Sequence, residues 1–193
     1  YLWTDEVIVS AASNNEVRSL KDLKGKTIFI TGATDGIGLL TAQKLIAGGH
    51  QVLLHGRHPD KLNRISASLD GASTYCADLS VIDEVTSLSS AILAEYQQLD
   101  VLINNAGVVI GGRIMAEHSL ENAKAEFETN VWGPFNLSKS FAPALAANGG
   151  GVIVNVLSAV SWLSMKEVAT YAMSKSAAWS MTNGLRLELA RQG

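Results

Sequence analysis

The sequence predicts an α/β fold in which helices cover both faces of a parallel sheet. Short apolar runs and helical patterns alternate five times along the chain, with no internal repeat. The apolar runs are continuous rather than alternating, which is typical of strands that are buried on both faces. The 193 residues are 47% apolar and 17% charged, a length and balance that suit one domain with its own core.

Each expected strand is rich in β-branched and apolar residues, and each expected helix repeats apolar residues at helical spacing. The expected strands are 27–31, 51–55, 73–76, 101–103 and 152–156. The expected helices are 39–46, 60–69, 81–97, 119–147 and 169–191. Glycines end several elements, as Gly48-Gly49 does for the first helix. Alternation of this kind is typical of βαβ units with right-handed crossovers.

Two stretches depart from the regular pattern. Residues 1–24 show no period, and we expect an N-terminal arm ahead of a domain that spans 25–193. The long helix at 119–147 contains Gly133-Pro134. We expect a kink there, because proline lacks the N–H group that the interior of a helix needs.

Composition excludes several classes of protein. Fifteen Lys and Arg against 18 Asp and Glu leave no basic excess for binding a nucleic-acid backbone. No apolar run approaches the ~18 residues of a membrane span, and no signal peptide is visible. The single cysteine, Cys76, rules out an intrachain disulfide and fits a reducing compartment. We therefore expect a cytoplasmic protein. The spacing of His50, His55 and His58 is not that of metal ligands, so we expect no metal site.

A glycine-rich turn follows the first expected strand and precedes a helix. It reads Gly32-Ala33-Thr34-Asp35-Gly36-Ile37-Gly38, which is neither G-x-G-x-x-G nor a P-loop. Glycines in this place let backbone N–H groups approach a pyrophosphate, which the positive end of the helix dipole stabilises. The turn is therefore a candidate phosphate site, and the alternative is a tight turn without a ligand.

Four motifs follow one another along the chain. They are Thr31-Gly32-x-x-x-Gly36-Ile37-Gly38, Asn104-Asn105-Ala106-Gly107, Ser158 and Tyr171-x-x-x-Lys175. In this order they closely resemble the short-chain dehydrogenase/reductase family, in its compact single-domain branch, over about residues 22–193. The resemblance implies a Rossmann-type doubly wound parallel sheet with strand order 3-2-1-4-5. It also implies an oxidoreductase that interconverts a ketone or aldehyde and an alcohol with a nicotinamide cofactor.

The resemblance assigns catalytic roles to four side chains. Tyr171 matches the family's acid/base, and Lys175 matches its partner. Ser158 matches the serine that hydrogen-bonds the substrate oxygen, and Asn130 matches the asparagine that helps to hold a water in the proton relay.

The resemblance also implies a set of cofactor-binding residues. Asp78 matches the acidic residue that contacts the adenine ring. Asn104 and Gly107 match the loop that supports the central sheet and lies near the adenosine ribose. The cofactor-binding residues are Gly32, Thr34, Asp35, Gly36, Ile37, Gly38, Arg57, Asp78, Leu79, Asn105, Ala106, Gly107, Tyr171 and Lys175.

The pairing of Tyr171 with Lys175 also makes chemical sense by itself. Residues four apart on a helix share one face. A tyrosine ordinarily titrates near ~10 and is a poor base at neutral pH, but a nearby ammonium favours the phenolate. We therefore expect Lys175 to lower the pKa of Tyr171. Ser158 would stabilise charge on the substrate oxygen, and Ser161 and Ser164 match the pattern less well.

Arg57 favours NADP as the cofactor. A carboxylate at the end of the second strand would bind the ribose hydroxyl of NAD, but the chain has none there before Asp60. The guanidinium of Arg57 can instead offer two donors to a phosphate. Asp35 opposes this choice, because it stands in the glycine turn where many NADP-preferring relatives carry a basic residue. We expect NADP, and NAD stays open.

Two alternative functions remain beside the oxidoreductase. The first is a non-catalytic NAD(P)-binding sensor or pseudoenzyme with the same fold. The intact set of Asn130, Ser158, Tyr171 and Lys175 argues against it. The second is a nucleotide-sugar epimerase of a related larger branch, which has a different glycine spacing and a longer chain.

The resemblance finally leads to expectations about partners and length. We expect a small carbonyl or alcohol substrate, with Trp162 and Leu163 at its pocket, and a homodimer or homotetramer. Relatives pair through the helices that here begin near Ser119 and Ala169. They also continue with two more strands and a substrate-covering loop, so we expect a further segment after Gly193. Without it, the strand at 152–156 would be an exposed edge.

Overall fold

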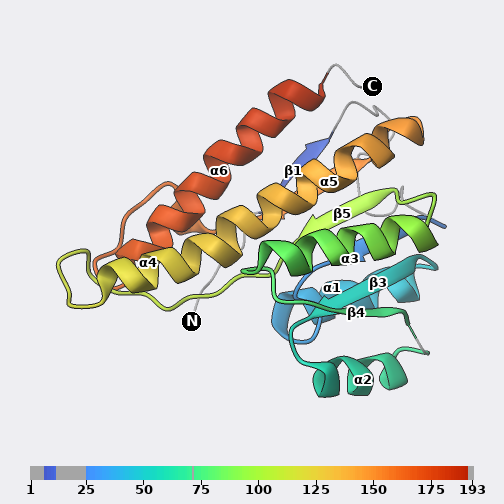
Figure 1. The fold of residues 1–193 in the computed structure, drawn as a ribbon, viewed down its shortest axis with the longest axis horizontal. Coiled ribbons are helices and arrows are strands. Elements are labelled where there is room, and N and C mark those ends of the chain that lie inside the picture. Colours follow the sequence, from blue (N-terminus) through green and yellow to red (C-terminus); the bar gives the residue numbers. More distant parts are fainter. Residues whose placement is uncertain (1–6, 12–24, 71, 191–193) are drawn as a thin grey trace.

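A six-stranded sheet with helices on both faces forms the frame of the protein in the computed structural model (Figure 1). The structure describes residues 7–11, 25–70 and 72–190. The strands are β1 (Val7–Ala11), β2 (Thr27–Ile30), β3 (Gln51–Gly56), β4 (Thr74–Cys76), β5 (Val101–Asn104) and β6 (Val152–Val156). The helices are α1 (Gly36–Ala47), α2 (Pro59–Ser68), α3 (Ile82–Glu95), α4 (Ser119–Phe127), α5 (Gly133–Ala147) and α6 (Ala169–Leu189).

The strand order is β1-β6-β5-β2-β3-β4, and all neighbours are parallel except β1 and β6. The five parallel strands therefore lie in the order 3-2-1-4-5 of the sequence prediction, which is confirmed. The order reverses direction between β2 and β5. In open α/β sheets, ligands bind outside the carboxyl ends of the strands at such a point.

Two apolar layers explain why the strand sequences are continuously apolar. On one face of the sheet, Ile28, Ile30 and Leu54 pack against α1 and α2. On the other face, Phe29 and Leu53 pack against α3 and α5. Successive strand residues point to opposite faces, so both of a strand's side-chain rows must be apolar.

The edge beside β6 is covered by β1. Val7–Ala11 pairs antiparallel with β6, from Val7 opposite Val156 to Ala11 opposite Val152. The expectation of an exposed edge at this strand is therefore wrong, because β1 supplies partners for the backbone N–H and C=O groups of β6. Residues 1–6 and 12–24 of the expected arm, and the end of the last expected helix at 191, lie outside the described residues.

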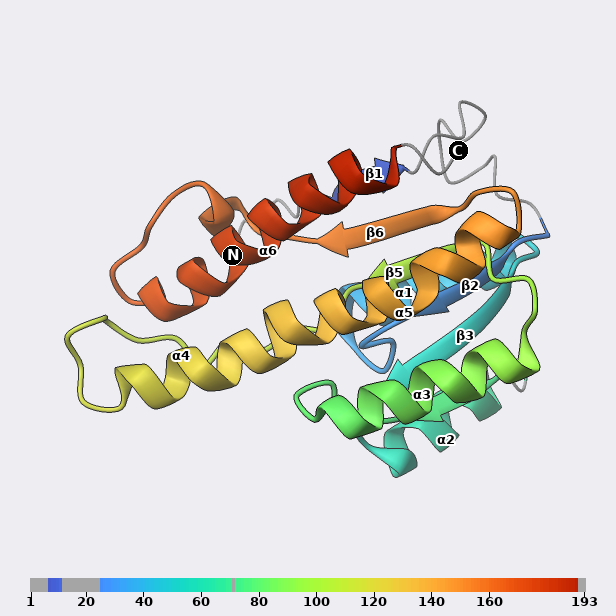
Figure 2. The same cartoon turned by 45° about the horizontal axis from the view of Figure 1, so that its top comes forward.

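A π-helical segment, η2 (Glu128–Trp132), interrupts the long helix between α4 and α5. The structure places this segment directly before Gly133-Pro134, and the expected kink there stays a prediction. The N–H of Gly133 bonds to the carbonyl of Glu128, five residues earlier, and Pro134 has no N–H to return to Asn130. Figure 2 shows α4, η2 and α5 as one long rod with α6 beside it.

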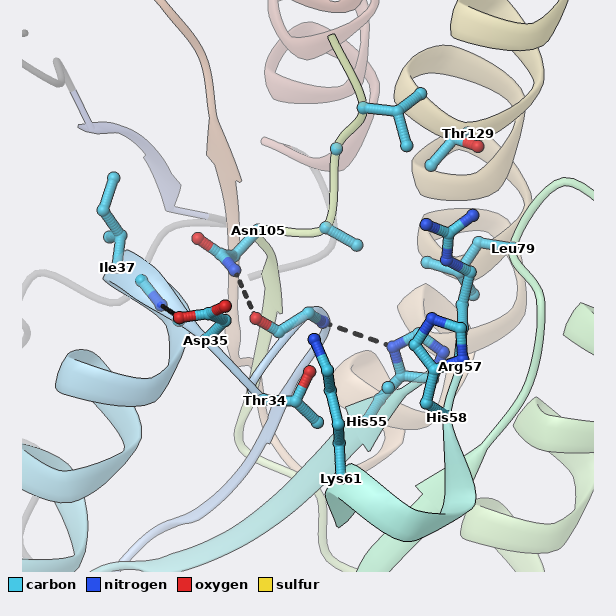
Figure 3. Close-up of a pocket in the computed structure, with 17 residues that line it drawn as sticks. Thr34, Asp35, Ile37, His55, Arg57, His58, Lys61, Leu79, Asn105 and Thr129 are labelled. Atoms are coloured by element: carbon cyan, nitrogen blue, oxygen red, sulfur yellow. Dashed lines mark hydrogen bonds between the residues drawn. The ribbon is translucent and has the colours of Figure 1, made fainter. Parts of the chain in front are cut away.

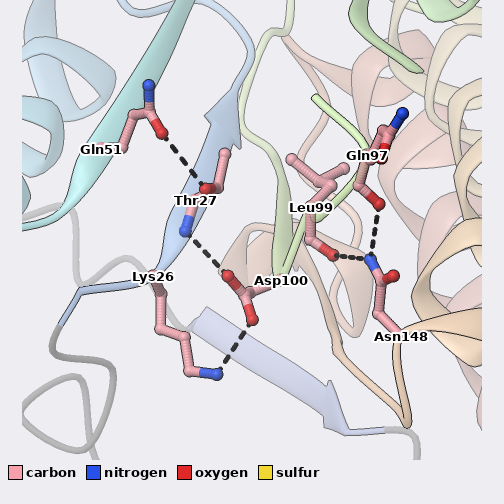
Figure 4. A network of polar contacts seen from close by, with 7 residues as sticks. All are labelled: Lys26, Thr27, Gln51, Gln97, Leu99, Asp100 and Asn148. Atoms are coloured by element: carbon pink, nitrogen blue, oxygen red, sulfur yellow. Dashed lines mark hydrogen bonds and ion pairs between the residues drawn. The ribbon is translucent and has the colours of Figure 1, made fainter. Parts of the chain in front are cut away.

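Polar contacts tie the amino ends of the strands together (Figure 4). The carboxylate of Asp100 accepts hydrogen bonds from Lys26 Nζ at 2.9 Å and from the Thr27 N–H at 2.8 Å. Asn148 Nδ2 donates to the carbonyls of Gln97 and Leu99. These contacts lie at the edge of the sheet opposite to the carboxyl ends of the parallel strands, where a ligand site is expected.

No helix in the described part of the chain combines the length and apolarity that crossing a membrane would require.

Candidate cofactor and catalytic site

A cleft of about 410 Å³ opens at the carboxyl ends of β2, β3 and β5 (Figure 3). It lies where the strand order reverses, as expected for this type of sheet. The residues that line it are Gly32, Thr34, Asp35, Gly36, Ile37, Gly38, His55, Gly56, Arg57, His58, Lys61, Leu79, Asn105, Ala106, Gly107, Val108 and Thr129. The structure thus brings eleven of the expected cofactor residues together. The lining does not include Asp78, Tyr171 or Lys175.

The glycines of the turn are required by its geometry. Gly32 and Gly36 have φ angles of +64° and +51°, which side chains rarely adopt. A Cβ at Gly32 would lie 2.8 Å from the Cα of Ala106, and one at Gly38 would collide with the carbonyl oxygen of Gly32. The turn can therefore close tightly enough to aim the start of α1 at the cleft.

The loop after β5 is fastened to the glycine turn by side chains of both. The hydroxyl of Thr31 accepts hydrogen bonds from the N–H groups of Asn105 and Ala106, each at 3.0 Å. Asn105 Nδ2 donates to the carbonyls of Thr31 at 2.9 Å and Gly32 at 3.1 Å. The two walls of the cleft are therefore held together as one unit.

Asn104 supports the sheet beneath this loop, as expected. Its Nδ2 donates to Asn155 Oδ1 at 2.8 Å and to the Ser138 hydroxyl at 3.3 Å. Asn155 Nδ2 in turn donates to the Thr182 hydroxyl on α6. This buried chain of polar groups connects β5, β6, α5 and α6.

His55 is a site residue whose role could not be read from the sequence. Its side chain is buried, its Nδ1 lies 3.3 Å from the N–H of Gly32, and its Nε2 lies 3.0 Å from the carbonyl of Ala77. An imidazole that accepts at Nδ1 and donates at Nε2 is neutral. Burial lowers the pKa of His55 to about 4, against an opposing contribution from the bond to Ala77. His55 therefore links the glycine turn to the loop after β4.

Asp78 uses its carboxylate to fix its own loop. Oδ1 accepts hydrogen bonds from the N–H of Ser80 at 2.9 Å and from its hydroxyl at 2.7 Å. Partial burial would raise the pKa of Asp78, but these two bonds and the charge of Arg57 outweigh it and hold the pKa below its usual value. The expected contact with adenine stays a prediction, and Leu79 is the neighbour that lines the cleft.

Lys175 is buried beneath Tyr171 on α6. Its Nζ donates to the carbonyl of Val156, at the end of β6, at 2.9 Å. The same ammonium lies 5.9 Å from the centre of the Tyr171 ring. The expected sharing of one helix face is therefore present in the structure. A buried cation beside a phenol favours the ionised form of that phenol.

The π-helical segment η2 places Asn130 against the loop after β5. Asn130 Oδ1 accepts from the N–H of Val108 at 2.8 Å, and its Nδ2 donates to the Val108 carbonyl at 2.9 Å. Nδ2 also donates to the hydroxyl of Ser174 at 3.0 Å, and that hydroxyl donates to the carbonyl of Tyr171 at 2.8 Å. Ser174, which the sequence pattern leaves unspecified, thus joins Asn130 to the tyrosine turn.

Ser158 caps a short 3₁₀ helix, η3 (Ala159–Ser161), directly after β6. Its hydroxyl oxygen accepts from the N–H of Val160, and the Ser161 hydroxyl accepts from the N–H of Ser158, both at 3.4 Å. The Ser161 carbonyl accepts from Ser176 on α6. Capping occupies acceptor positions of Ser158, so its O–H is still able to donate to a substrate oxygen.

Gly107 connects the cleft to the catalytic candidates. It lines the cleft, and a Cβ at this position would lie 3.2 Å from Asn130 Oδ1 and 3.5 Å from Lys175 Nζ. The backbone of Gly107 thus lies between the cleft and the amide of Asn130 and ammonium of Lys175. Within the described ranges, no three His, Cys, Asp or Glu side chains cluster as a metal site would need.

Known proteins with similar sequences are named as dehydrogenases or oxidoreductases. Residues 26–193 match a family model described as short chain dehydrogenase. An uncharacterized oxidoreductase of Staphylococcus haemolyticus is 32% identical over 176 residues, which cover 90% of this chain and 76% of that protein. The 2,3-dihydro-2,3-dihydroxybenzoate dehydrogenase of Bacillus subtilis is 37% identical over 179 residues, which cover 88% of this chain and 66% of that enzyme.

Solved structures with a similar fold are also named as short-chain dehydrogenases. A short-chain dehydrogenase from Streptomyces avermitilis has a TM-score of 0.81 at 27% identity and covers 88% of this chain, which spans 62% of that one. A short chain dehydrogenase from Burkholderia cenocepacia in complex with NADP has a TM-score of 0.78 at 31% identity, with 88% and 69% covered. The chain therefore spans between three fifths and four fifths of these relatives.

Proposed function

The chain belongs to the short-chain dehydrogenase family, a family of oxidoreductases, and on this premise we propose that it interconverts a ketone or aldehyde and an alcohol with NADP. The observation that carries the proposal is the position of Gly107, which lines the nucleotide cleft and lies against Asn130 and Lys175. One strip of backbone therefore borders both the proposed cofactor site and two side chains that would support the acid/base group, Tyr171.

The cleft fits the phosphates of a dinucleotide. A Cβ at Gly36 would have no atom of the described residues within 4 Å, so the backbone is open at the start of α1. Asp35 accepts a hydrogen bond from the N–H of Gly36, and the N–H groups of the following residues are left for an anion. Gly32, Gly36 and Gly38 would hold the pyrophosphate, and Leu79 and Asp78 would flank the adenine.

Proton transfer is assigned to Tyr171. A bound nicotinamide cofactor would supply the hydride in reduction and accept it in oxidation. Tyr171 would donate its phenolic proton to the carbonyl oxygen in reduction, or accept the alcohol proton in oxidation. The ammonium of Lys175, held by Val156, stabilises the phenolate that this leaves.

Ser158 and Asn130 would support the same step. The O–H of Ser158 would donate to the substrate oxygen and stabilise the charge that develops there. Asn130, fixed by both backbone groups of Val108, would hold a water on the path that returns the proton to Tyr171. Ser174 orders this arrangement, because it bonds to both Asn130 and Tyr171.

A cofactor and carbonyl screen tests this function. We expect the protein to oxidise NADPH faster than NADH with at least one member of a panel of aliphatic, aromatic and cyclic ketones and aldehydes. The measurement is the loss of absorbance of the reduced cofactor, with cofactor binding followed separately by fluorescence. Cofactor binding without turnover across the panel would contradict the enzyme and support the sensor instead.

We also propose a homodimer or homotetramer formed through α4, η2, α5 and α6. Five large apolar side chains on these elements are 37–61% exposed, and exposed apolar patches mark interaction surfaces. They are Leu120, Trp132, Phe135, Met173 and Trp179. Sedimentation equilibrium should give two or four times the mass of one chain, and a purely monomeric protein would contradict the proposal.

The cytoplasmic location and the pocket role of Trp162, which stacks edge-on with Trp179, stay predictions.

A further inference from the structure

Three basic side chains gather on the side of the cleft that β3 and α2 form. Arg57, His58 and Lys61 all line the cleft, and only Arg57 is expected there from the sequence. Figure 3 shows Lys61 extending from the start of α2 toward the turn that carries Thr34, whereas Arg57 extends toward Leu79. The two permanent cations therefore border different parts of one opening.

The lining of the cleft contains little negative charge to balance these cations. Within the described ranges, neither Arg57 nor Lys61 forms an ion pair. Among the residues that the structure describes, Asp35 is the only acidic one in the lining, and its carboxylate accepts a hydrogen bond from the N–H of Gly36. Figure 3 shows Asp35 across the turn, on the side of Ile37. One oxygen of the Asp35 carboxylate is therefore occupied by the backbone of its own turn.

Arg57 has a carboxylate near it, that of Asp78, which would repel a bound phosphate. The charge of Arg57 acts on Asp78 and helps to hold that carboxyl ionised. A phosphate near Arg57 would therefore also meet the carboxylate of Asp78. Lys61 faces Thr34 instead, whose methyl group borders Gly56 at the end of β3. The end of β3 is the place where the adenosine ribose is recognised in such folds.

The Lys61 side chain extends toward the region between the glycine turn and the end of β3. The glycine turn supplies backbone donors for the pyrophosphate, and the ribose is what lies between that turn and β3. We propose that Lys61 is a specificity-determining residue that binds the 2′-phosphate of NADP from the side of Thr34, while Arg57 binds it from the side of Leu79. This inference rests on the proposed NADP-dependent function.

Direct binding measurements separate the 2′-phosphate from the rest of the cofactor. The probes are adenosine 2′,5′-bisphosphate against 5′-AMP, and NADPH against NADH, titrated by calorimetry. Lys61→Met keeps the apolar stem and removes the charge, and Lys61→Arg restores the charge. Lys44→Met, an exposed lysine in the last turn of α1, is the matched control.

We expect Lys61→Met to weaken the bisphosphate and NADPH about tenfold, as the loss of one hydrogen bond to a charged group does. Binding of 5′-AMP and NADH should change less than twofold, Lys61→Arg should recover most of the loss, and Lys44→Met should bind like the unmodified protein. Equal losses for both members of each pair, or no loss, would overturn the inference. Lys61 is exposed, so we expect the variants to fold, and thermal melting checks this.

The outcomes also distinguish the inference from the proposed function. A protein that binds the bisphosphate no more tightly than 5′-AMP overturns both the role of Lys61 and the NADP preference. A selective loss in Lys61→Met without turnover of any carbonyl supports the role of Lys61 and contradicts the enzyme. Turnover with NADPH but no selective loss in Lys61→Met overturns the inference alone.

Discussion

Replacing Tyr171 by Phe is expected to lower kcat by a factor of about 10²–10⁴, the usual contribution of a positioned general acid or base. Phenylalanine keeps the ring above Lys175, where Nζ lies 5.9 Å from the ring centre, and removes only the group that exchanges the proton. Binding of NADPH should stay within about threefold, because the cleft lining does not include Tyr171. Steady-state rates on an accepted ketone, with a parallel fluorescence titration of cofactor, measure both quantities.

Tyr96→Phe is the matched control for this change. The hydroxyl of Tyr96 bonds to Ser73 beside β4, so its removal should leave kcat unchanged. A Tyr171→Phe protein with kcat within threefold of the unmodified enzyme would contradict the assignment of Tyr171. Comparable losses in kcat and in cofactor affinity would instead indicate a structural role for the hydroxyl.

Acid should destabilise the protein through His55. The pKa of His55 is lowered from 6.5 to about 4 in the folded protein, mainly by burial. The unfolded chain therefore binds a proton at higher pH than the folded one does. The stability contribution of the neutral imidazole is complete above pH 6.5 and is lost as the pH falls toward 4. The shift corresponds to about 3 kcal/mol of the free energy of unfolding.

His55→Gln isolates this contribution, because an amide can donate and accept as His55 does but does not titrate. Urea unfolding between about pH 7 and pH 4 should show a steeper fall in the free energy of unfolding for the unmodified protein than for His55→Gln. His58→Gln, an exposed histidine three residues further on, should keep the steep fall. Parallel pH profiles for the unmodified protein and His55→Gln would contradict the role of His55.

Most of the fold can be predicted from local patterns. The five parallel strands appear within one or two residues of the expected bounds, because a strand buried on both faces needs a continuous apolar run. The glycine turn is equally readable, since positive φ angles at Gly32 and Gly36 restrict the choice of residue. The strand order follows from the family resemblance rather than from periodicity.

The candidate site is predictable as a set of residues but not as a set of contacts. The sequence places Tyr171 and Lys175 on one face of a helix, because their spacing is local. It does not show that Lys175 reaches Val156, or that Asn130 bonds to Val108 from a π-helical segment. His55 reads only as one more strand residue, because both of its partners come from other loops.

By itself, the sequence determined that this protein is an α/β domain with a glycine-rich turn after its first parallel strand and a tyrosine–lysine helix. Those features depend on neighbouring residues and on spacings of two or four positions. Only the tertiary structure decided that β1 closes the edge of β6, that His55 links two loops, and that Lys61 faces the same cleft as Arg57. Each of these depends on segments that meet only when the sheet assembles, and no local pattern records which distant partner a backbone edge or a side chain will find.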